Sequence, residues 1–423
     1  MKKRQNKRES RHKPGKSSFV GWSSFIFILR IIGAVIVLAT QVLLARWMGA
    51  HELGIYVFAF SWLILLSTVV GLGFPMASMR FIGKATHDGQ PSLVRGFIRR
   101  GREVTAVAGL LAAVTGTGIV YSMAPRLPAE QVDTLIFALM CVPVLAVMRM
   151  HERAAHAHSW FVLAMLPNMM LRPAIFLLVV FLASRQVSLN ASNVMFFQVT
   201  IIVSLAVGHY LVFSRKLRHE IGPAKPRFED ATWFKAAAPL LIVTLFSQYF
   251  ADLDITIVGL LVEPQHLAIY NAGYRVALII TFGFLAVNAV LMPGISRLYA
   301  RGENLEIQRL VARATQLTSF GAILAIAVLY WWGETILGWF GEEFVRGYSS
   351  LIILALSQLA LALIGPATVL LSVTGHQAHC LNVFSWALVM LVILNLLLTP
   401  VLGIEGAALA VLIDTLFWGF WLR

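Results

Sequence analysis

The strongest constraint on this chain is a series of about twelve apolar segments, separated by gaps that are alternately basic and almost free of positive charge. A segment of roughly 20 apolar residues has the length of a helix that crosses the hydrocarbon core of a bilayer. Of the 423 residues, 59% are hydrophobic and only 13% are charged, and a soluble domain of that size could not bury so much apolar surface. The sequence therefore predicts an all-α polytopic membrane protein.

The apolar segments divide into two sets of six. We expect transmembrane helices near residues 22–45, 54–79, 104–123, 133–148, 160–183, 193–213, 237–262, 267–293, 315–332, 349–374, 380–399 and 404–422. The first segment is too long for the apolar part of a signal peptide, and no small-residue cleavage site follows it. The predicted organisation is a basic cytoplasmic tail (1–20), an N-terminal six-helix bundle (21–213), a cytoplasmic linker (214–236) and a C-terminal six-helix bundle (237–423).

The 34 lysines and arginines are distributed very unevenly between the two sides of the predicted helices. On one side lie 27 of them, in the N-terminal tail, in the gaps after the second, fourth, sixth and eighth helices, and at Arg423. The gaps on the other side hold only Arg46, Arg126, Arg185 and Arg346. Because cytoplasmic loops are enriched in Lys and Arg, both termini are predicted to be cytoplasmic. The net charge of +14 then indicates attraction to anionic lipid headgroups, and we predict no nucleic-acid partner.

The sequence also repeats itself with an offset near 214 residues. GAHELGIYVFAFS at 49–61 aligns with EPQHLAIYNAGYR at 263–275, which places Leu53 on Leu267 and Tyr56 on Tyr270. Each half contains an even number of helices, so the two halves have the same orientation. The repeat therefore predicts a pseudo-twofold axis along the membrane normal, an arrangement that suits alternating access around a cleft between the halves.

Three stretches resemble one family of membrane transporters. LLARWMGAHELGIYVFAFSWLILL, followed by GLGFPMASMRFIGKA, resembles the opening of polysaccharide and oligosaccharide flippases. GEEFVRGYSSLIILALSQLALALIGPATVLLSVTGHQAH resembles the family's tenth helix and its Gly-His exit, and LGIEGAALAVLI resembles the start of its last helix. The family shares a superfamily with multidrug and toxin extrusion transporters and with lipid II flippases. Its members often carry fourteen helices, whereas this chain has room for about twelve.

The resemblance implies a function in the bacterial cytoplasmic (inner) membrane. The chain would move a polyprenyl-diphosphate-linked oligosaccharide to the outer leaflet by alternating access, for lipopolysaccharide, exopolysaccharide or other surface glycan assembly. It would not be an enzyme and would need no cofactor. Its expected partners are the lipid-linked glycan, anionic membrane lipids, and a polysaccharide polymerase with its assembly proteins.

Four alternative functions stay open. Two belong to the same superfamily: a cation-coupled multidrug exporter and a lipid II flippase. A drug exporter for organic cations calls for an acidic and aromatic cavity, which three arginines within the helices disfavour. A membrane-embedded glycosyltransferase or polymerase should show large extramembrane loops with carboxylates, and the outer gaps here are short. A purely structural scaffold would have no use for charge within its helices.

Charged residues inside apolar helices are the first candidates for a binding site, since a charge at the bilayer centre costs at least about 2.5–3.5 kcal/mol. Arg172 is the deepest cation and precedes Pro173, which favours a kink there. A guanidinium binds phosphate oxygens in a bidentate way, so Arg172, Arg275 and Arg30 are candidate ligands of the diphosphate. Arg172 could instead form a structural salt bridge or cap the kink, and Arg30 could reach the headgroups.

The acidic residues inside helices suggest a second kind of site. Asp252 and Asp254 are two residues apart, about 200° around a helix, so only one of them can face the cleft. One of these, or Asp414, could couple transport to an ion, although Asp254 could simply neutralise Arg275 and Asp414 could pair across the bundle. Gln41 and Asn168 could bind sugar hydroxyls or join helices.

Two apparent motifs carry no prediction of a site. His151, His156, His158, His376 and His379 lack the cysteines or carboxylates that would complete a metal site. The glycine that a P-loop requires five residues before Gly15 is replaced by Ser10, so no nucleotide site is predicted. Cys141 and Cys380 offer no disulfide framework.

Overall fold

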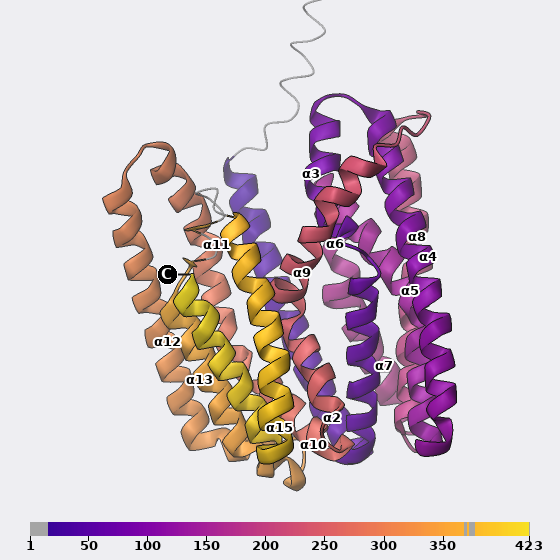
Figure 1. Ribbon diagram of the computed structural model, residues 1–423, viewed down its shortest axis with the longest axis vertical. Coiled ribbons are helices and arrows are strands. Elements are labelled where there is room, and N and C mark those ends of the chain that lie inside the picture. The colour runs from indigo at the N-terminus through magenta and orange to yellow at the C-terminus, as the bar shows by residue number, and fades with distance from the viewer. Residues whose placement is uncertain (1–15, 368–369, 372–376, 423) are drawn as a thin grey trace, which may run out of the picture.

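A computed structural model describes residues 16–367, 370–371 and 377–422, with side chains described from residue 31 onward except at 285, 289, 290, 293, 377 and 378. Every regular element in these ranges is helical (Figure 1), which confirms the predicted all-α class. The elements are α2 (Lys16–Val69), α3 (Phe74–His87), α4 (Pro91–Met123), η1 (Ala124–Arg126), α5 (Ala129–Ala157), α6 (Phe161–Leu166), η2 (Pro167–Leu171), α7 (Arg172–Ala183), α8 (Ala191–Ile221), α9 (Asp230–Gly259), α10 (Pro264–Ala277), α11 (Ile279–Ala300), α12 (Asn304–Gly338), η3 (Glu342–Gly347), α13 (Tyr348–Ile364) and α15 (Gln377–Trp421).

Within these ranges, ten helical stretches are long and apolar enough to cross a bilayer. Two of them are much longer than one crossing requires, Ile31–His87 with 57 residues and His379–Trp421 with 43 residues. Each contains a glycine with non-helical backbone angles, Gly49 in α2 and Gly403 in α15. At 1.5 Å per residue, each stretch accommodates two crossings of a core about 30 Å thick. The described helices are therefore long enough for the twelve crossings that the sequence predicts.

The helices form two lobes that face each other (Figure 1). Helices α3–α8, with the second crossing in α2, make one lobe and α10–α15 the other, while the first crossing in α2 and helix α9 lie between them. The backbone of α9 leaves helical geometry at Tyr249 (φ −128°, ψ 18°). Before this point α9 contacts α3, since the Ala237 carbonyl lies against Gly73. Near and beyond it α9 contacts α15, where the Phe246 and Phe384 rings stack with centroids 4.1 Å apart.

The two lobes meet closely where the second crossing in α2 runs beside α10. His51 Nδ1 lies 3.2 Å from Gln265 Oε1, and these residues are 214 positions apart. Residues related by a twofold axis contact each other only where they lie near that axis, so this contact supports the pseudo-twofold relation inferred from the repeat. Gly54 packs directly against the Pro264 backbone, and the Ala50 amide donates to Glu343 Oε1 (2.7 Å).

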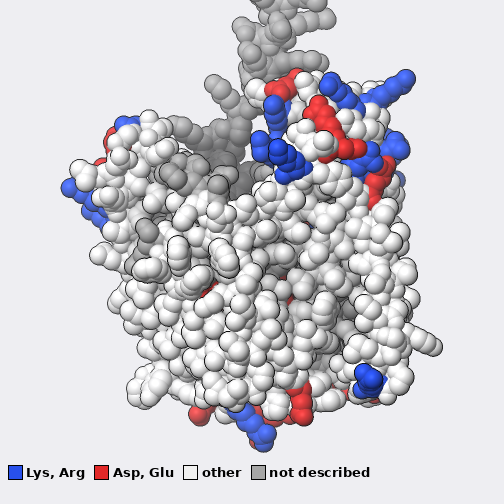
Figure 2. All heavy atoms as spheres, in the orientation of Figure 1, with Lys and Arg blue, Asp and Glu red and all other residues white. Residues whose placement is uncertain are grey.

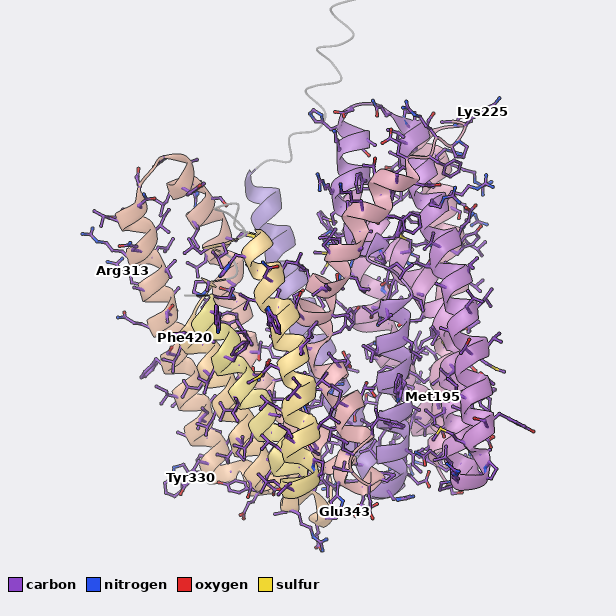
Figure 3. All side chains as sticks on the ribbon, in the orientation of Figure 1. Met195, Lys225, Arg313, Tyr330, Glu343 and Phe420 are labelled. Atoms are coloured by element: carbon purple, nitrogen blue, oxygen red, sulfur yellow. The ribbon has the colours of Figure 1, made fainter. Side chains whose placement is uncertain are left out.

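Charge separates the two ends of the molecule. Figure 2 shows Lys and Arg gathered at one end, above a broad belt that is almost free of charged atoms. We call this the basic end; Lys225 and Arg313 lie toward it, whereas Tyr330 and Glu343 lie at the opposite end (Figure 3). Exposed apolar side chains occupy the belt, such as Leu111 and Val114 on α4 and Phe320 on α12. The belt has the composition expected of a lipid-facing surface.

Several boundaries differ from the sequence prediction: the helix expected over 267–293 is divided into α10 and α11, and the one expected over 349–374 ends at Ile364. Two further differences bear on the cavity. The helix expected over 133–148 continues to Ala157, so Arg149 and Arg153 belong to α5 rather than to a loop. Residues 149–157 contain no glycine or proline, and Met150 and Ala154 are completely buried; helix propensity and packing therefore extend the helix. The helix expected over 54–79 breaks before α3, where Leu72 and Gly73 adopt positive φ values.

The connection between the lobes is bound to α4. Helix α8 ends at Ile221 and α9 begins at Asp230, which leaves residues 222–229 as the connecting segment. The Arg227 amide donates to the Ser92 carbonyl (3.0 Å), and both the Nε and Nη2 atoms of Arg100 donate to Asp230 at 2.8 Å. The segment is therefore held against the basic end of the first lobe.

Candidate functional site

A cavity of about 520 Å³ lies between the first lobe and helices α9 and α10. It extends from the last turns of α5, where Arg153 and His156 line it, to Gln41 and Tyr56 near the contact between α2 and α10. Six of its lining residues carry charged groups: Arg149, Glu152, Arg153, Arg172, Asp252 and Arg275. A polar cavity of this kind at membrane depth is suited to a charged ligand.

Arg172 is positioned by a local irregularity in the fifth crossing. A π-helical turn, Pro167–Leu171, immediately precedes it, and Pro173 follows it. Because Pro173 has no N–H, the Met169 carbonyl lacks its usual helical donor; Gly33 of α2 packs against that carbonyl, where a Cβ would lie only 2.3 Å away. A π-helical irregularity therefore lies directly before Arg172, where the sequence predicts a kink.

The Arg172 guanidinium makes no hydrogen bond and no ion pair with the described residues. Its nearest ring contact is Phe60, with the guanidinium carbon 5.9 Å from the ring centroid. An arginine has five N–H donors, and those of Arg172 face a cavity. They are therefore available to a ligand.

Two further arginines connect α5 with the kink in α9. Arg149 Nη1 donates to the Ile64 carbonyl (3.0 Å) and to Thr68, and its guanidinium carbon lies 4.7 Å from the Tyr249 ring centroid. Arg153 donates to Gln248 Oε1. Both arginines thus join the first lobe to α9 at the residue where that helix bends.

The first-lobe wall also contains a buried carboxylate. Glu152 is 9% exposed, and its Oε1 accepts a hydrogen bond from Asn168 Nδ2 (2.5 Å). Asn168 Oδ1 and Gln41 Oε1 are buried without a hydrogen-bond partner among the described residues. These oxygen atoms are acceptors, so this wall can bind hydrogen-bond donors of a ligand.

The opposite wall carries the pair Asp252–Arg275. Arg275 Nη2 lies 3.9 Å from Asp252 Oδ1, a long ion pair in which both side chains are partly exposed to the cavity. The sequence suggested Asp254 as the partner of Arg275, and that pairing is absent from the described contacts. Asp252 is the member of the acidic pair that faces the cavity, because the two side chains point to different faces of α9.

Asp254 belongs to a second polar cluster, which lies within the other lobe. Its Oδ2 accepts from the Tyr270 hydroxyl (2.6 Å) and its Oδ1 from Asn395 Nδ2 (3.0 Å), while Thr399 donates to Asn395 Oδ1 (3.0 Å). Asp414 is completely buried within electrostatic range of Asp254, and neither of its carboxylate oxygens has a hydrogen-bond partner among the described residues. Two carboxylates are thus buried together with neutral neighbours.

The structure therefore sorts the predicted residues into two groups. Arg172, Arg275, Gln41, Asn168 and Asp252 line one cavity, whereas Asp254 and Asp414 lie in the separate cluster. The side chain of Arg30 lies outside the described residues, although its backbone is part of α2.

Sequence reasoning missed Arg149, Glu152 and Arg153 as cavity residues. It placed the two arginines in a loop after the fourth helix. The spacing of these residues is the signal that could have found them: positions 149, 152 and 153 share one face of a helix if α5 continues.

The two lobes and the helices between them form a fold found in known membrane transporters. The structure of lipid II flippase MurJ in an inward closed conformation superposes with a TM-score of 0.74, at 16% identity over 94% of this chain and 86% of that one. An inward-facing multidrug resistance MATE family transporter gives a TM-score of 0.67, at 13% identity over 93% of this chain and 92% of that one. A superfamily transporter from Pyrococcus furiosus gives 0.62 at 13% identity, over 93% of each chain. At these identities the likeness establishes the fold alone.

Sequence comparison establishes the family. Residues 21–299 match the family described as polysaccharide biosynthesis protein, and the chain belongs to that family. The probable low-salt glycan biosynthesis flippase Agl15 of Haloferax volcanii is 27% identical over 195 residues, which are 44% of this chain and 40% of that protein. The chain thus matches less than half the length of this curated relative. The family and the structural neighbours comprise transporters and flippases, not catalysts.

Proposed function

We propose that this protein is a flippase that translocates a polyprenyl-diphosphate-linked oligosaccharide across the bacterial cytoplasmic membrane, for lipopolysaccharide, exopolysaccharide or other surface glycan assembly. The cavity binds the diphosphate and the first sugars, while the polyprenyl chain stays in the bilayer. The two lobes then rock about their contact near the pseudo-twofold axis and expose the cavity to the other side.

The observation that carries this proposal is the Arg172 guanidinium, which is held in the cavity by the irregular fifth crossing and is unpaired among the described residues. Keeping an arginine at membrane depth without a partner is unfavourable, and bound ligand oxygens would compensate for that cost. Phosphate oxygens match the guanidinium in geometry as well as in charge.

The charge balance of the cavity also favours an anionic headgroup. Four arginines and two carboxylates line it, which leaves two unit positive charges when all six groups are ionised. A glycosylated diphosphate carries two negative charges, so the two match. An organic cation would instead meet a net repulsive cavity, which disfavours the drug-exporter alternative.

The proposed orientation places the basic end, with both termini, in the cytoplasm. Lysine and arginine gather at that end (Figure 2), as the positive-inside rule requires. The cavity extends toward the same end, and its far limit is closed by the contact between α2 and α10. The structure would therefore correspond to the state that loads substrate from the cytoplasmic side.

The cluster around Asp254 and Asp414 is the proposed ion-coupling site. Both carboxylates are buried without a basic partner among the described residues, which is costly, and a bound proton or metal cation would neutralise one of them. Asp252 connects this cluster to the cavity, since it lies two residues from Asp254 on α9 and contacts Arg275.

The test is lipid analysis of a strain that lacks the gene, with mass spectrometry for polyprenyl-diphosphate oligosaccharides. We expect a complete repeat unit to accumulate, and the intact gene but not Arg172→Ala to clear it. Arg309→Ala is the matched control, because Arg309 is exposed at the protein surface and pairs only with Glu306 among the described residues. Normal glycan without accumulation would refute the proposal in favour of drug export, and accumulation of lipid II would identify a lipid II flippase.

A further inference from the structure

We infer that Glu152 makes the cavity selective for the glycosylated carrier over the free carrier diphosphate; this inference rests on the proposed function. A flippase that accepted the unglycosylated carrier would move it outward without a glycan, which would be futile. A single carboxylate among the phosphate-binding arginines is suited to distinguish the two lipids.

The position of Glu152 supports this role. Its carboxylate is nine-tenths buried, lines the cavity and lies within electrostatic range of Arg149, Arg153 and Arg172. It nevertheless makes no direct ion pair with any of them in the described part of the chain, and its observed hydrogen bond comes from the neutral Asn168 (2.5 Å). A carboxylate that served only to neutralise an arginine would be expected to contact one.

The neighbouring acceptors indicate what Glu152 binds. Asn168 Oδ1 and Gln41 Oε1 are buried on the cavity wall without donors among the described residues. An ionised carboxylate is likewise an acceptor alone. Sugar hydroxyls and N–H groups supply donors, whereas an ionised phosphate at neutral pH supplies almost none. This wall therefore matches a sugar and opposes the additional negative charge of a terminal phosphate that carries no sugar.

The two lipids differ in charge, and this difference determines how strongly the cavity can discriminate between them. In the glycosylated lipid both phosphates are diesters or anhydrides with one negative charge each. The free diphosphate ends in a phosphate that is bonded only through the anhydride oxygen, and the second ionisation of this terminal phosphate near neutral pH raises the total charge to about −3. With Glu152 ionised the cavity holds two net positive charges and matches the glycosylated lipid. Replacing Glu152 by glutamine leaves three, which match the free diphosphate instead.

The experiment measures binding of three lipids to the full chain in neutral-lipid nanodiscs. The probes are a short polyprenyl diphosphate, its methyl ester, and the same lipid carrying N-acetylglucosamine on the diphosphate. The methyl ester has the charge of the glycosylated lipid without a sugar, so it separates the effect of charge from that of the sugar donors. Glu152→Gln removes the charge with little change in shape, Glu152→Asp retains it, and Glu103→Gln removes an exposed carboxylate on α4, outside the cavity.

We expect the natural protein to bind the methyl ester and the glycosylated lipid at least about tenfold more tightly than the free diphosphate. Glu152→Gln should strengthen free diphosphate binding about tenfold and remove the preference, whereas Glu152→Asp and Glu103→Gln should keep it. Equal affinity of the natural protein for all three lipids, or an equal change for all three in Glu152→Gln, would overturn the inference alone.

Failure of the natural protein to bind any of the three lipids would refute the proposed function itself. If Glu152→Gln does not fold, the ranking of the free diphosphate against its methyl ester on the natural protein decides the question, because they differ in terminal charge and neither carries a sugar.

Discussion

Replacing Gly54 by alanine should weaken the closed contact between the lobes. A Cβ built on Gly54 would lie 1.7 Å from the Pro264 carbonyl oxygen and 2.9 Å from the Pro264 Cα. Both atoms belong to the backbone of α10, so no side-chain rotation can relieve the overlap. The second crossing in α2 and helix α10 must separate instead.

The magnitude follows from that geometry. Real Cβ contacts are essentially never shorter than 3.0 Å, so the two backbones must part by about 1.3 Å, and overpacking of this kind costs about 1–3 kcal/mol. This cost applies only while the end opposite the basic end is closed, because α2 and α10 no longer touch when that end opens. A free-energy change of that size alters the ratio of the closed to the open state about 5- to 150-fold.

The assay is cross-linking at the same contact. His51 and Gln265 contact each other near the axis, and cysteines at both positions should react with a short bifunctional thiol reagent when this end is closed. The native Cys141 and Cys380 are buried and free, and both are replaced beforehand. We expect Gly54→Ala to lower the cross-linking yield severalfold. Gly83→Ala is the control, because a Cβ there meets nothing within 4 Å.

One result would refute the reasoning. If Gly54→Ala expressed at the same level, unfolded at the same temperature and cross-linked as fully as the control, the closed contact would tolerate the added methyl group. The backbone approach of α2 and α10 would then not control the state of this end.

Three further predictions follow from other parts of the structure. Gly403 joins the last two crossings at φ 62° and ψ −139°, and Gly403→Ala should lower the free energy of unfolding by about 1–3 kcal/mol. The unfolding temperature in detergent should then be lower than for the control Gly118→Ala, where a Cβ meets open space. Asp414→Asn should abolish the dependence of transport on an ion gradient while headgroup binding persists; retained ion dependence would exclude the cluster as coupling site. Asp252→Asn should release Arg275 from its 3.9 Å ion pair and tighten the binding of inorganic pyrophosphate at low salt. High salt should diminish this gain in affinity. Unchanged binding would show that Arg275 does not contact the anion.

The sequence was sufficient for the architecture because the bilayer leaves few alternatives. Apolar length determines the number of crossings, and the repeat near Tyr56 and Tyr270 determines the symmetry. Where a backbone break depends on tertiary packing, the sequence was less informative. The interruption before α3 is stabilised by the approach of Gly73 to the Ala237 carbonyl, a contact between residues far apart in the chain.

The candidate site was predictable only in part. Arg172 was found because a charge beside proline in an apolar segment is unfavourable without a purpose. Arg149 and Glu152 were missed because hydropathy falls at the end of α5 although the helix continues. Helical periodicity predicted that Asp252 and Asp254 face opposite sides of α9. Which of the two points away from the cavity depends on the position of α15, because α15 brings Asn395 to Asp254.

The repeat also shows how the two halves have diverged. Its offset places Thr40 and Tyr56 where the second half has Asp254 and Tyr270. Tyr270 donates to Asp254, whereas the Thr40 hydroxyl donates to the Ile36 carbonyl of its own helix (2.7 Å) and Tyr56 lines the cavity. A homodimer of one six-helix bundle would have to place every substitution in both copies. Fusion into a single chain removes that requirement, so the second half can carry buried carboxylates at Asp254 and Asp414 while the first half carries Arg149, Arg153 and Arg172 along the cavity.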